Sequence, residues 1–194
     1  MNNSNEVTIG TQVWMVENLN VDKFRNGDAL QEVKKIEEWV RAGEKGEPAW
    51  CYYDNDQANG EKYGKLYNWY AVNDPRGLAP EGWHVPSDKE WYILDDYIGK
   101  FAGKKMKSTS GFKRGNGTNK NGFSGLPGGW RCAQVSYSTG ALRTFEFVGE
   151  NGDWWSSTEA YTGHAWKRSL NHSRYLLRTN SNMVSGAYVR CLRD

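Results

Sequence analysis

The feature that most limits how this chain can fold is a series of phrases in which glycines stand close to tryptophans or tyrosines. They run through the middle and C-terminal parts of the sequence: GKLYNWYAVN, GLAPEGWHVPSDKEW, NGFSGLPGGWR, GDWWSSTE and YVRCLRD. No two of them are alike, whereas a solenoid or a propeller repeats one phrase at a fixed period. The phrases therefore indicate separate strands and turns of one irregular domain that spans residues 1–194.

The core of this domain has to be built largely from aromatic rings. Ten Trp and eleven Tyr occur among 194 residues, while only 38% of the residues are hydrophobic. A chain of this length buries roughly 70% of its surface on folding. Tryptophan and tyrosine bury large areas, but their N–H and O–H groups then need partners inside the protein.

Charge and composition exclude several classes of function. The formal net charge is +2, which argues against a dedicated nucleic-acid binder, because such proteins carry a clustered basic face. The basic residues between Lys104 and Arg114 lie among Gly and Ser, as in a solvated loop. No segment approaches the ~20 apolar residues of a membrane-spanning helix. Residues Met1 to Glu6 are polar and form no signal peptide, so we expect any export signal to have been removed.

Hydrophobic periodicity predicts two helices and an N-terminal hairpin. Residues 7–20 alternate in polarity around Gly10 and Thr11, which favours a short hairpin. From Ala29 to Ala42, apolar residues recur at three- and four-residue spacing, which predicts an amphipathic helix ended by Gly43. The apolar positions of that helix are Leu30, Val33, Ile36 and Val40.

The second helix has the clearer signal. Ser87 and Glu90 form an S-x-x-E capping box, and Pro86 stops any helix that runs in from upstream. Gly99 ends the helix. Its buried stripe is predicted to be Trp91, Leu94 and Ile98.

The remaining segments predict loops and short strands. Residues 43–62 and 103–125 are polar and Gly-rich, the first with a short strand at its aromatic island, Trp50 to Tyr53. Residues 63–73 fit either a helix or a strand, and a helix is favoured. Strands are predicted at 126–132, 142–148, 153–157, 165–170 and 187–192. The expected class is α+β, with helices in the first half and a meandering antiparallel sheet in the second.

Taken in order, these phrases resemble a known family. The residues that carry the likeness are Tyr63–Tyr70, Leu78–Trp91, Gly122–Gly129, Trp154–Glu159 and Val189–Asp194, with IGTQVWMVENLN as the opening phrase. The chain is identified as a member of the Fibrobacter succinogenes major paralogous domain family, which is abundant on secreted and surface proteins of Bacteroidota-like bacteria. The likeness covers essentially the whole chain.

The resemblance implies a fold and a location, but no activity. WHVPSDKEW and VRCLRD are similar to phrases of formylglycine-generating-enzyme-like domains. Both groups belong to the C-type-lectin-like fold, in which two main helices pack on a small twisted antiparallel sheet with long loops. The expected location is secreted or on the bacterial outer surface. Many relatives have a cysteine where this chain has Ala79, so the resemblance implies that Cys51 pairs with Cys191 in a disulfide and leaves Cys132 over.

Enzyme chemistry and metal binding have little support in the sequence. The three cysteines show no CxxC spacing, and Ser156 and Ser157 stand in no G-x-S-x-G elbow. His84 lies in the structural GWHVP phrase. The stretch from Asp54 to Glu61 is rich in oxygen atoms, but its spacing is wrong for an EF-hand. We expect no catalytic residues and no cofactor. A structural calcium ion stays an open alternative.

Recognition chemistry is concentrated between residues 160 and 186. Rings there can stack on sugar faces, while Arg and Asn side chains can hydrogen-bond hydroxyls or backbone amides. Strand alternation places Trp166 and Arg168 on one face. The candidate ligand-binding residues are Tyr161, His164, Trp166, Arg168, Asn171, His172, Arg174, Tyr175 and Arg178. A solvated hairpin with a buried Trp166 is the alternative interpretation of this segment.

The sequence thus predicts a non-enzymatic surface module that binds a glycan or a partner protein through residues 160–186, with the loop 103–121 nearby. Two alternatives stay open at this point. One is a structural or assembly domain of a bacterial surface protein. The other is a degenerate formylglycine-generating-enzyme-like protein with residual thiol chemistry.

Overall fold

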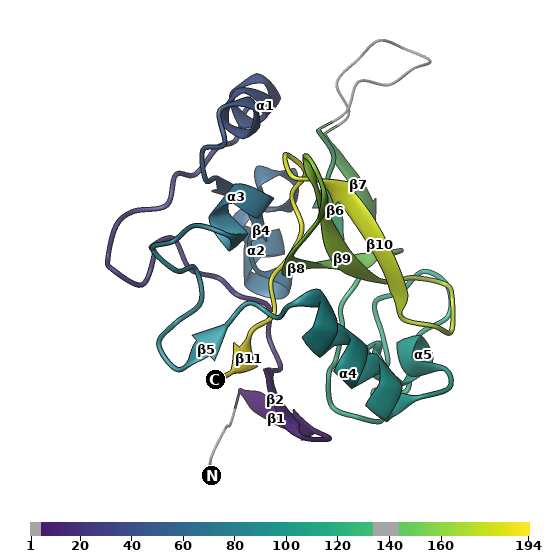
Figure 1. The fold of residues 1–194 in the computed structure, drawn as a ribbon. Helices are drawn as coiled ribbons and strands as arrows, with labels where there is room; N and C mark the ends of the chain where they lie inside the picture. Colours follow the sequence, from purple (N-terminus) through teal and green to yellow (C-terminus); the bar gives the residue numbers. More distant parts are fainter. Residues whose placement is uncertain (1–4, 134–143) are drawn as a thin grey trace.

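The computed structural model describes residues 5–133 and 144–194. Helices and strands are mixed along the chain, as in the α+β class (Figure 1). The helices are α1 (Ile36–Glu44), α2 (Gln57–Tyr63), α3 (Trp69–Val72), α4 (Asp88–Ile98) and α5 (Ala102–Met106), with a 3-10 helix η1 (Tyr53–Asn55). The strands are β1 (Glu6–Ile9), β2 (Gln12–Met15), β3 (Trp50–Cys51), β4 (Leu66–Tyr67), β5 (Trp83–His84), β6 (Gly128–Arg131), β7 (Phe145–Val148), β8 (Gly152–Tyr161), β9 (His164–Leu170), β10 (Leu177–Asn182) and β11 (Leu192–Arg193).

The two ends of the chain meet in one small sheet of order β1-β2-β11-β5. The predicted N-terminal hairpin is confirmed, since β1 pairs antiparallel with β2 across the turn at Gly10. In β11, Leu192 lies between Trp14 and His84. Figure 1 shows the C-terminus beside this hairpin. Residues 1–4 lie outside the described residues.

The larger sheet has the order β10-β9-β8-β6-β7. The strands predicted near 126–132, 153–157 and 165–170 correspond to β6, β8 and β9, and β8 and β9 form a long antiparallel hairpin. The predicted strand 142–148 starts outside the described residues, and its described part contains β7. β10 was not predicted, because its sequence LRTNSN has the polarity of a turn. It forms because it pairs with β9 along its whole length.

Helix α4 forms as the sequence predicts. Ser87 caps it, the side chain of Glu90 returns to the Ser87 backbone N–H, and Gly99 follows the last turn. The predicted stripe of Trp91, Leu94 and Ile98 is buried. The helix lies against β8 and β9 and is the longest in the described part of the chain.

The predicted helix over 29–42 is wrong in its first half. Helix α1 begins only at Ile36, because the preceding residues run extended beside β3. The Val33 N–H donates to the Trp50 carbonyl, and the Trp50 N–H donates to Gln31. Gly43 lies inside the helix rather than after it, where a Cβ atom would come 2.4 Å from the Val184 side chain.

The segments predicted as Gly-rich loops contain short helices. Asp56 caps α2 by accepting a hydrogen bond from the Ala58 N–H, within the predicted loop 43–62. The predicted strand around Trp50 is confirmed as β3. The ambiguous segment 63–73 divides into β4 and the one-turn helix α3. Helix α5 occupies the start of the predicted loop 103–125.

Aromatic rings form the centre of the core, as the composition indicates. Trp14 of β2, Trp91 of α4, Phe123 and Trp154 of β8 are each fully buried, with neighbouring ring centroids 4.7–6.0 Å apart. This cluster joins both sheets to α4. The indole N–H groups of the following residues donate to backbone or side-chain oxygens: Trp14, Trp39, Trp50, Trp69, Trp91, Trp154 and Trp155.

The cysteines do not form the bridge that the resemblance implied. Cys51, Cys132 and Cys191 are buried, and none is within disulfide distance of another. Cys51 and Cys191 pack in separate hydrophobic clusters, which holds their sulfur atoms apart. Across the described ranges, no helix combines the length and the apolar character needed to cross a bilayer.

Candidate functional site

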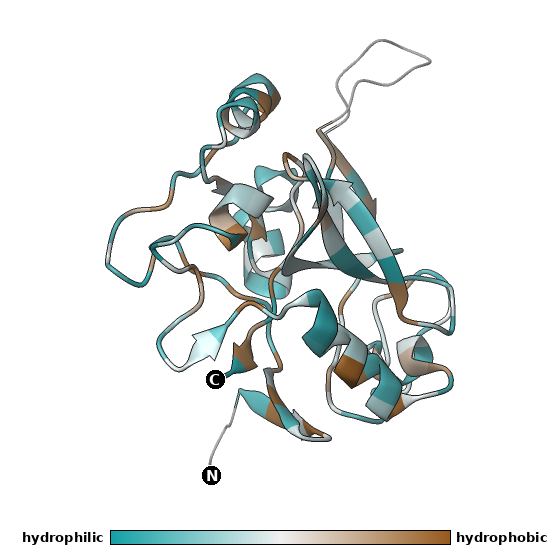
Figure 2. Cartoon of the chain, viewed as in Figure 1, coloured by the Kyte–Doolittle hydropathy of each residue, from teal (hydrophilic) through white to brown (hydrophobic). Residues whose placement is uncertain are grey.

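Strand register places several predicted binding residues on one outward face of the larger sheet. His164, Trp166 and Arg168 alternate along β9 and point to the same side. On the neighbouring strands, Tyr161 pairs with His164, and Asn180 pairs with Trp166. We call the following set the β8–β10 face: Tyr161, His164, Trp166, Arg178, Asn180 and Asn182. Figure 2 shows largely hydrophilic and neutral residues along β10, in keeping with its sequence LRTNSN.

One end of the β8–β10 face is an ordered aromatic pair. The rings of Tyr161 and His164 stack with centroids 4.4 Å apart and planes 22° apart. The Tyr161 hydroxyl donates to the Asn180 Oδ1 at 3.2 Å. Tyr161 is nevertheless 55% exposed. The two rings therefore form an accessible surface whose geometry is fixed by these contacts.

The other end of the face is tied to helix α4 through Asp88. The Arg178 Cζ lies 3.3 Å from the ring centroid of the half-buried Trp166, and Arg178 donates from Nε and Nη2 to the Asp88 carboxylate. On the far side, Arg168 Nη1 donates to Asp88 Oδ1 at 2.7 Å. Burial alone would raise the pKa of Asp88, but the hydrogen bonds from Arg178 and Arg168 outweigh it and lower the pKa.

Arg168 is not part of the exposed β8–β10 face; it is buried against helix α4 at one end of that face. Alternation correctly predicts that Trp166 and Arg168 share a side, but α4 covers the Arg168 end, and the residue is only 2% exposed. The sequence signal for this contact is Asp88, the acidic residue directly after the cap of α4. Trp166 is half-buried, with Arg178 stacked on one face of its ring.

The other predicted residues belong to the turn between β9 and β10. Asn171 Oδ1 accepts from the Ser173 N–H, which shapes the turn. Arg174 and Tyr175 are exposed and both rest on Phe101, the guanidinium carbon of Arg174 at 4.6 Å from the ring centroid. His172 is separated from them and lines a cavity with residues of two other loops. The nine predicted residues therefore do not form one continuous surface.

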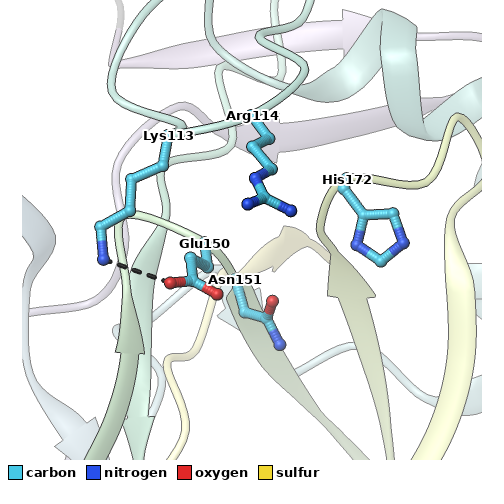
Figure 3. Close-up of a pocket in the computed structure, with 5 residues that line it drawn as sticks. All are labelled: Lys113, Arg114, Glu150, Asn151 and His172. Carbon is cyan, nitrogen blue, oxygen red and sulfur yellow. Dashed lines mark hydrogen bonds and ion pairs between the residues drawn. The ribbon is translucent and has the colours of Figure 1, made fainter.

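The cavity beside His172 is lined in part by Lys113 and Arg114, two residues of the segment that the sequence predicts to be a solvated loop. Lys113 and Arg114 enter it from the 103–125 segment, and Glu150 and Asn151 enter from the turn between β7 and β8 (Figure 3). Its volume is about 250 Å³. The Lys113 Nζ lies 3.2 Å from a Glu150 oxygen. The signal available in the sequence was the run of basic residues, but only folding brings it to His172.

The described residues contain no group of three or more His, Cys, Asp or Glu side chains that could hold a metal ion. The oxygen-rich stretch from Asp54 to Glu61, where the sequence allows a structural calcium ion, forms η1 and the start of α2. His84 lies between Glu90 and the side chain of Asp194, with ring nitrogens at 3.0 and 2.7 Å from their oxygens. It thereby joins the cap of α4 to the C-terminal strand.

Burial also affects the thiols. It raises the pKa of Cys51 to about 11 and the pKa of Cys191 to about 12. The thiolate is the nucleophilic form of cysteine. At neutral pH both side chains are therefore almost entirely protonated.

Comparison with known proteins places the chain at the level of a family. The model of the Fibrobacter succinogenes major domain matches residues 7–193. Neither the curated proteins nor the solved structures contain a match to the chain.

Proposed function

The chain belongs to the Fibrobacter succinogenes major domain family, and we propose that it is a non-enzymatic recognition module of C-type-lectin-like architecture. It acts on the bacterial outer surface or in a secreted protein. It binds a glycan or a partner protein through the β8–β10 face, without a cofactor.

The proposal is carried by the stacked, hydrogen-bonded arrangement of Tyr161, His164 and Asn180. These side chains are held by the β8–β9 and β9–β10 pairings and by their own contacts, so binding requires little further ordering. Rigid aromatic rings beside amide groups are the mixture that antibody paratopes use. A sugar ring can stack on the exposed tyrosine while the neighbouring amides bond its hydroxyls.

Three general features of the architecture support the C-type-lectin-like part of the proposal, although β6 pairs parallel with β8 instead of antiparallel as expected. The N- and C-terminal strands lie together in the sheet β1-β2-β11-β5. The two longest helices in the described ranges are α1 and α4, and α4 packs across the larger sheet. Long connections such as that between α5 and β6 occupy much of the rest of the chain.

A structural or assembly role is the second candidate, and one observation favours it. The Arg178–Asp88–Arg168 chain links the β9–β10 hairpin to α4. Under this alternative, the polar surface stabilises the domain and binds no ligand. Residual thiol chemistry is less well supported, because it needs accessible reactive thiols and these cysteines are buried.

The test is a binding screen of the purified domain against glycan arrays and surface proteins, with and without calcium. Tyr161→Ala and Asn180→Ala remove parts of the β8–β10 face. Tyr92→Ala is the matched control, because Tyr92 is also exposed but lies on α4. We expect saturable binding that each face variant weakens at least about tenfold, as for interface hot spots.

Melting temperatures distinguish the two candidates. Recognition requires that the face variants lose binding while their melting temperatures stay close to that of the unmodified protein. A blank screen in both calcium conditions, with lowered melting temperatures in the face variants, would support the structural role.

A further inference from the structure

The cavity in Figure 3 is dominated by positive charge. Lys113 and Arg114 each contribute one positive charge and Glu150 contributes one negative charge, which leaves a formal net charge of +1 on these three side chains. Lys113 is already paired with Glu150. Within the described part of the chain, the Arg114 guanidinium has no ion-pair or hydrogen-bond partner. In Figure 3 it lies between Glu150 and Asn151 on one side and His172 on the other.

The walls of the cavity are fixed by buried and backbone contacts. The Lys113 N–H donates to the Gly149 carbonyl at 2.6 Å, which joins the 103–125 segment to the β7–β8 turn. Lys107 is 1% exposed, and its Nζ donates to the carbonyls of Asn171 and Ser173 at 2.6 and 3.1 Å. The ammonium group of Lys107 thus holds the turn that carries His172. Lys107 is a positioning residue for this cavity.

The shape and chemistry of the cavity select a small anion. A guanidinium donates two parallel N–H groups to a carboxylate or a sulfate, an arrangement stronger than neutral hydrogen bonds. The side-chain amide of Asn151 and the imidazole of His172 can bond hydroxyl groups next to such an anion. At about 250 Å³, the volume falls below the roughly 300–1,000 Å³ of sites for drug-sized ligands. One charged sugar residue is a suitable occupant.

We propose that this cavity binds the carboxylate or sulfate of an acidic sugar, with Arg114 as the principal anion ligand and Asn151 and His172 as hydroxyl ligands. The site shares no residue with the β8–β10 face. It is therefore a second binding site, and it does not depend on the function proposed for that face.

The experiment is a titration of the ¹⁵N-labelled protein, followed by amide chemical shifts at constant ionic strength. The probes are sodium glucuronate, glucose as the uncharged analogue, and inorganic phosphate. We expect glucuronate to give saturable shifts at Lys113, Arg114, Asn151 and His172, and glucose to give none. The result that overturns the proposal is the absence of saturable shifts with glucuronate, or binding of phosphate alone.

Three variants test the assignment of the residues. Arg114→Gln should raise the dissociation constant for glucuronate at least about tenfold, since it removes a charge-assisted pair. Arg174→Gln is the matched control, because Arg174 is an exposed arginine of the β9–β10 turn that rests on Phe101, and it should change the constant less than about twofold. Glu150→Gln should tighten binding, because it frees Lys113.

Equal effects of Arg114→Gln and Arg174→Gln would refute a specific site and indicate general attraction to positive charge. Unchanged binding in both would refute the role of Arg114. Tyr161→Ala should leave glucuronate binding intact, so failure of the cavity and failure of the β8–β10 face are distinguishable.

Discussion

Replacing Arg168 by methionine tests whether this residue stabilises the fold through its buried ion pair with Asp88 rather than acting in a surface contact. Methionine retains most of the apolar stem and removes the guanidinium. In the structure, Arg168 is 2% exposed and donates both to the Asp88 carboxylate at 2.7 Å and to the Asp88 carbonyl at 3.2 Å. Removing one partner of a fully buried pair typically costs about 3–5 kcal/mol.

The expected loss for Arg168→Met lies below that range. Asp88 is partly exposed and keeps its two-point contact with Arg178, so its carboxylate is not left unpaired. The two hydrogen bonds of the charged guanidinium together contribute about 3–6 kcal/mol, but replacing it by methionine also removes the cost of burying its charge, which offsets part of that loss. We therefore expect a loss of about 2–3 kcal/mol. In a domain of this length, that lowers the melting temperature by about 5–10 °C.

The control is Arg178→Met, which removes the other cation from the same carboxylate. The Arg178 side chain is 48% exposed, and exposed ion pairs contribute about 0–1 kcal/mol. Urea unfolding followed by tryptophan fluorescence measures both variants. Equal losses for Arg168→Met and Arg178→Met, or a loss below about 1 kcal/mol for Arg168→Met, would refute the argument from burial.

Three further predictions concern acid stability, backbone strain and thiol reactivity. The pKa of Asp88 is lowered in the folded state, so its stabilising contribution is present above the ordinary value of about 3.9 and is lost as the pH falls through the lower folded value. The free energy of unfolding of Asp88→Asn should therefore fall less steeply than that of the unmodified protein as the pH is lowered below about 4. Gly129→Ala should destabilise the protein by about 2–4 kcal/mol, because Gly129 has φ +72 and a Cβ atom would lie 2.5 Å from the Glu146 carbonyl oxygen. Gly27→Ala, at φ +92 with open space around it, should cost only about 1 kcal/mol; similar unfolding midpoints for the two would contradict this. Cys51 and Cys191 should resist a thiol reagent in the native protein and react when it is unfolded, as mass spectrometry can follow; rapid modification of the native protein would show that they are accessible.

The features that could be read from the sequence are those that depend on neighbouring residues. The capping box at Ser87 and Glu90 needs only a three-residue spacing, and it forms helix α4 as expected. Alternation around Gly10 likewise predicts the N-terminal hairpin. The shortage of aliphatic residues beside ten tryptophans indicates an aromatic core, and rings from β2, α4 and β8 meet at its centre.

The features that only the tertiary structure decides depend on long-range pairing. Local periodicity at Leu30 and Val33 favours a helix, but hydrogen bonds to Trp50 make that segment extended. Strand β10 has no hydrophobic pattern and forms because β9 supplies its partners.

The same distinction applies to the candidate sites. Alternation places Trp166 and Arg168 on one face, yet only the packing of α4 decides that Arg168 is buried against Asp88. Arg114 and His172 are far apart in the sequence. The buried Lys107, which lies in the same segment as Arg114, donates to the Asn171 carbonyl next to His172, and this contact brings the two loops to one cavity. The sequence determines which side chains are present and how neighbours alternate. Contacts between distant segments decide which side chains remain accessible, because burial depends on what packs over them.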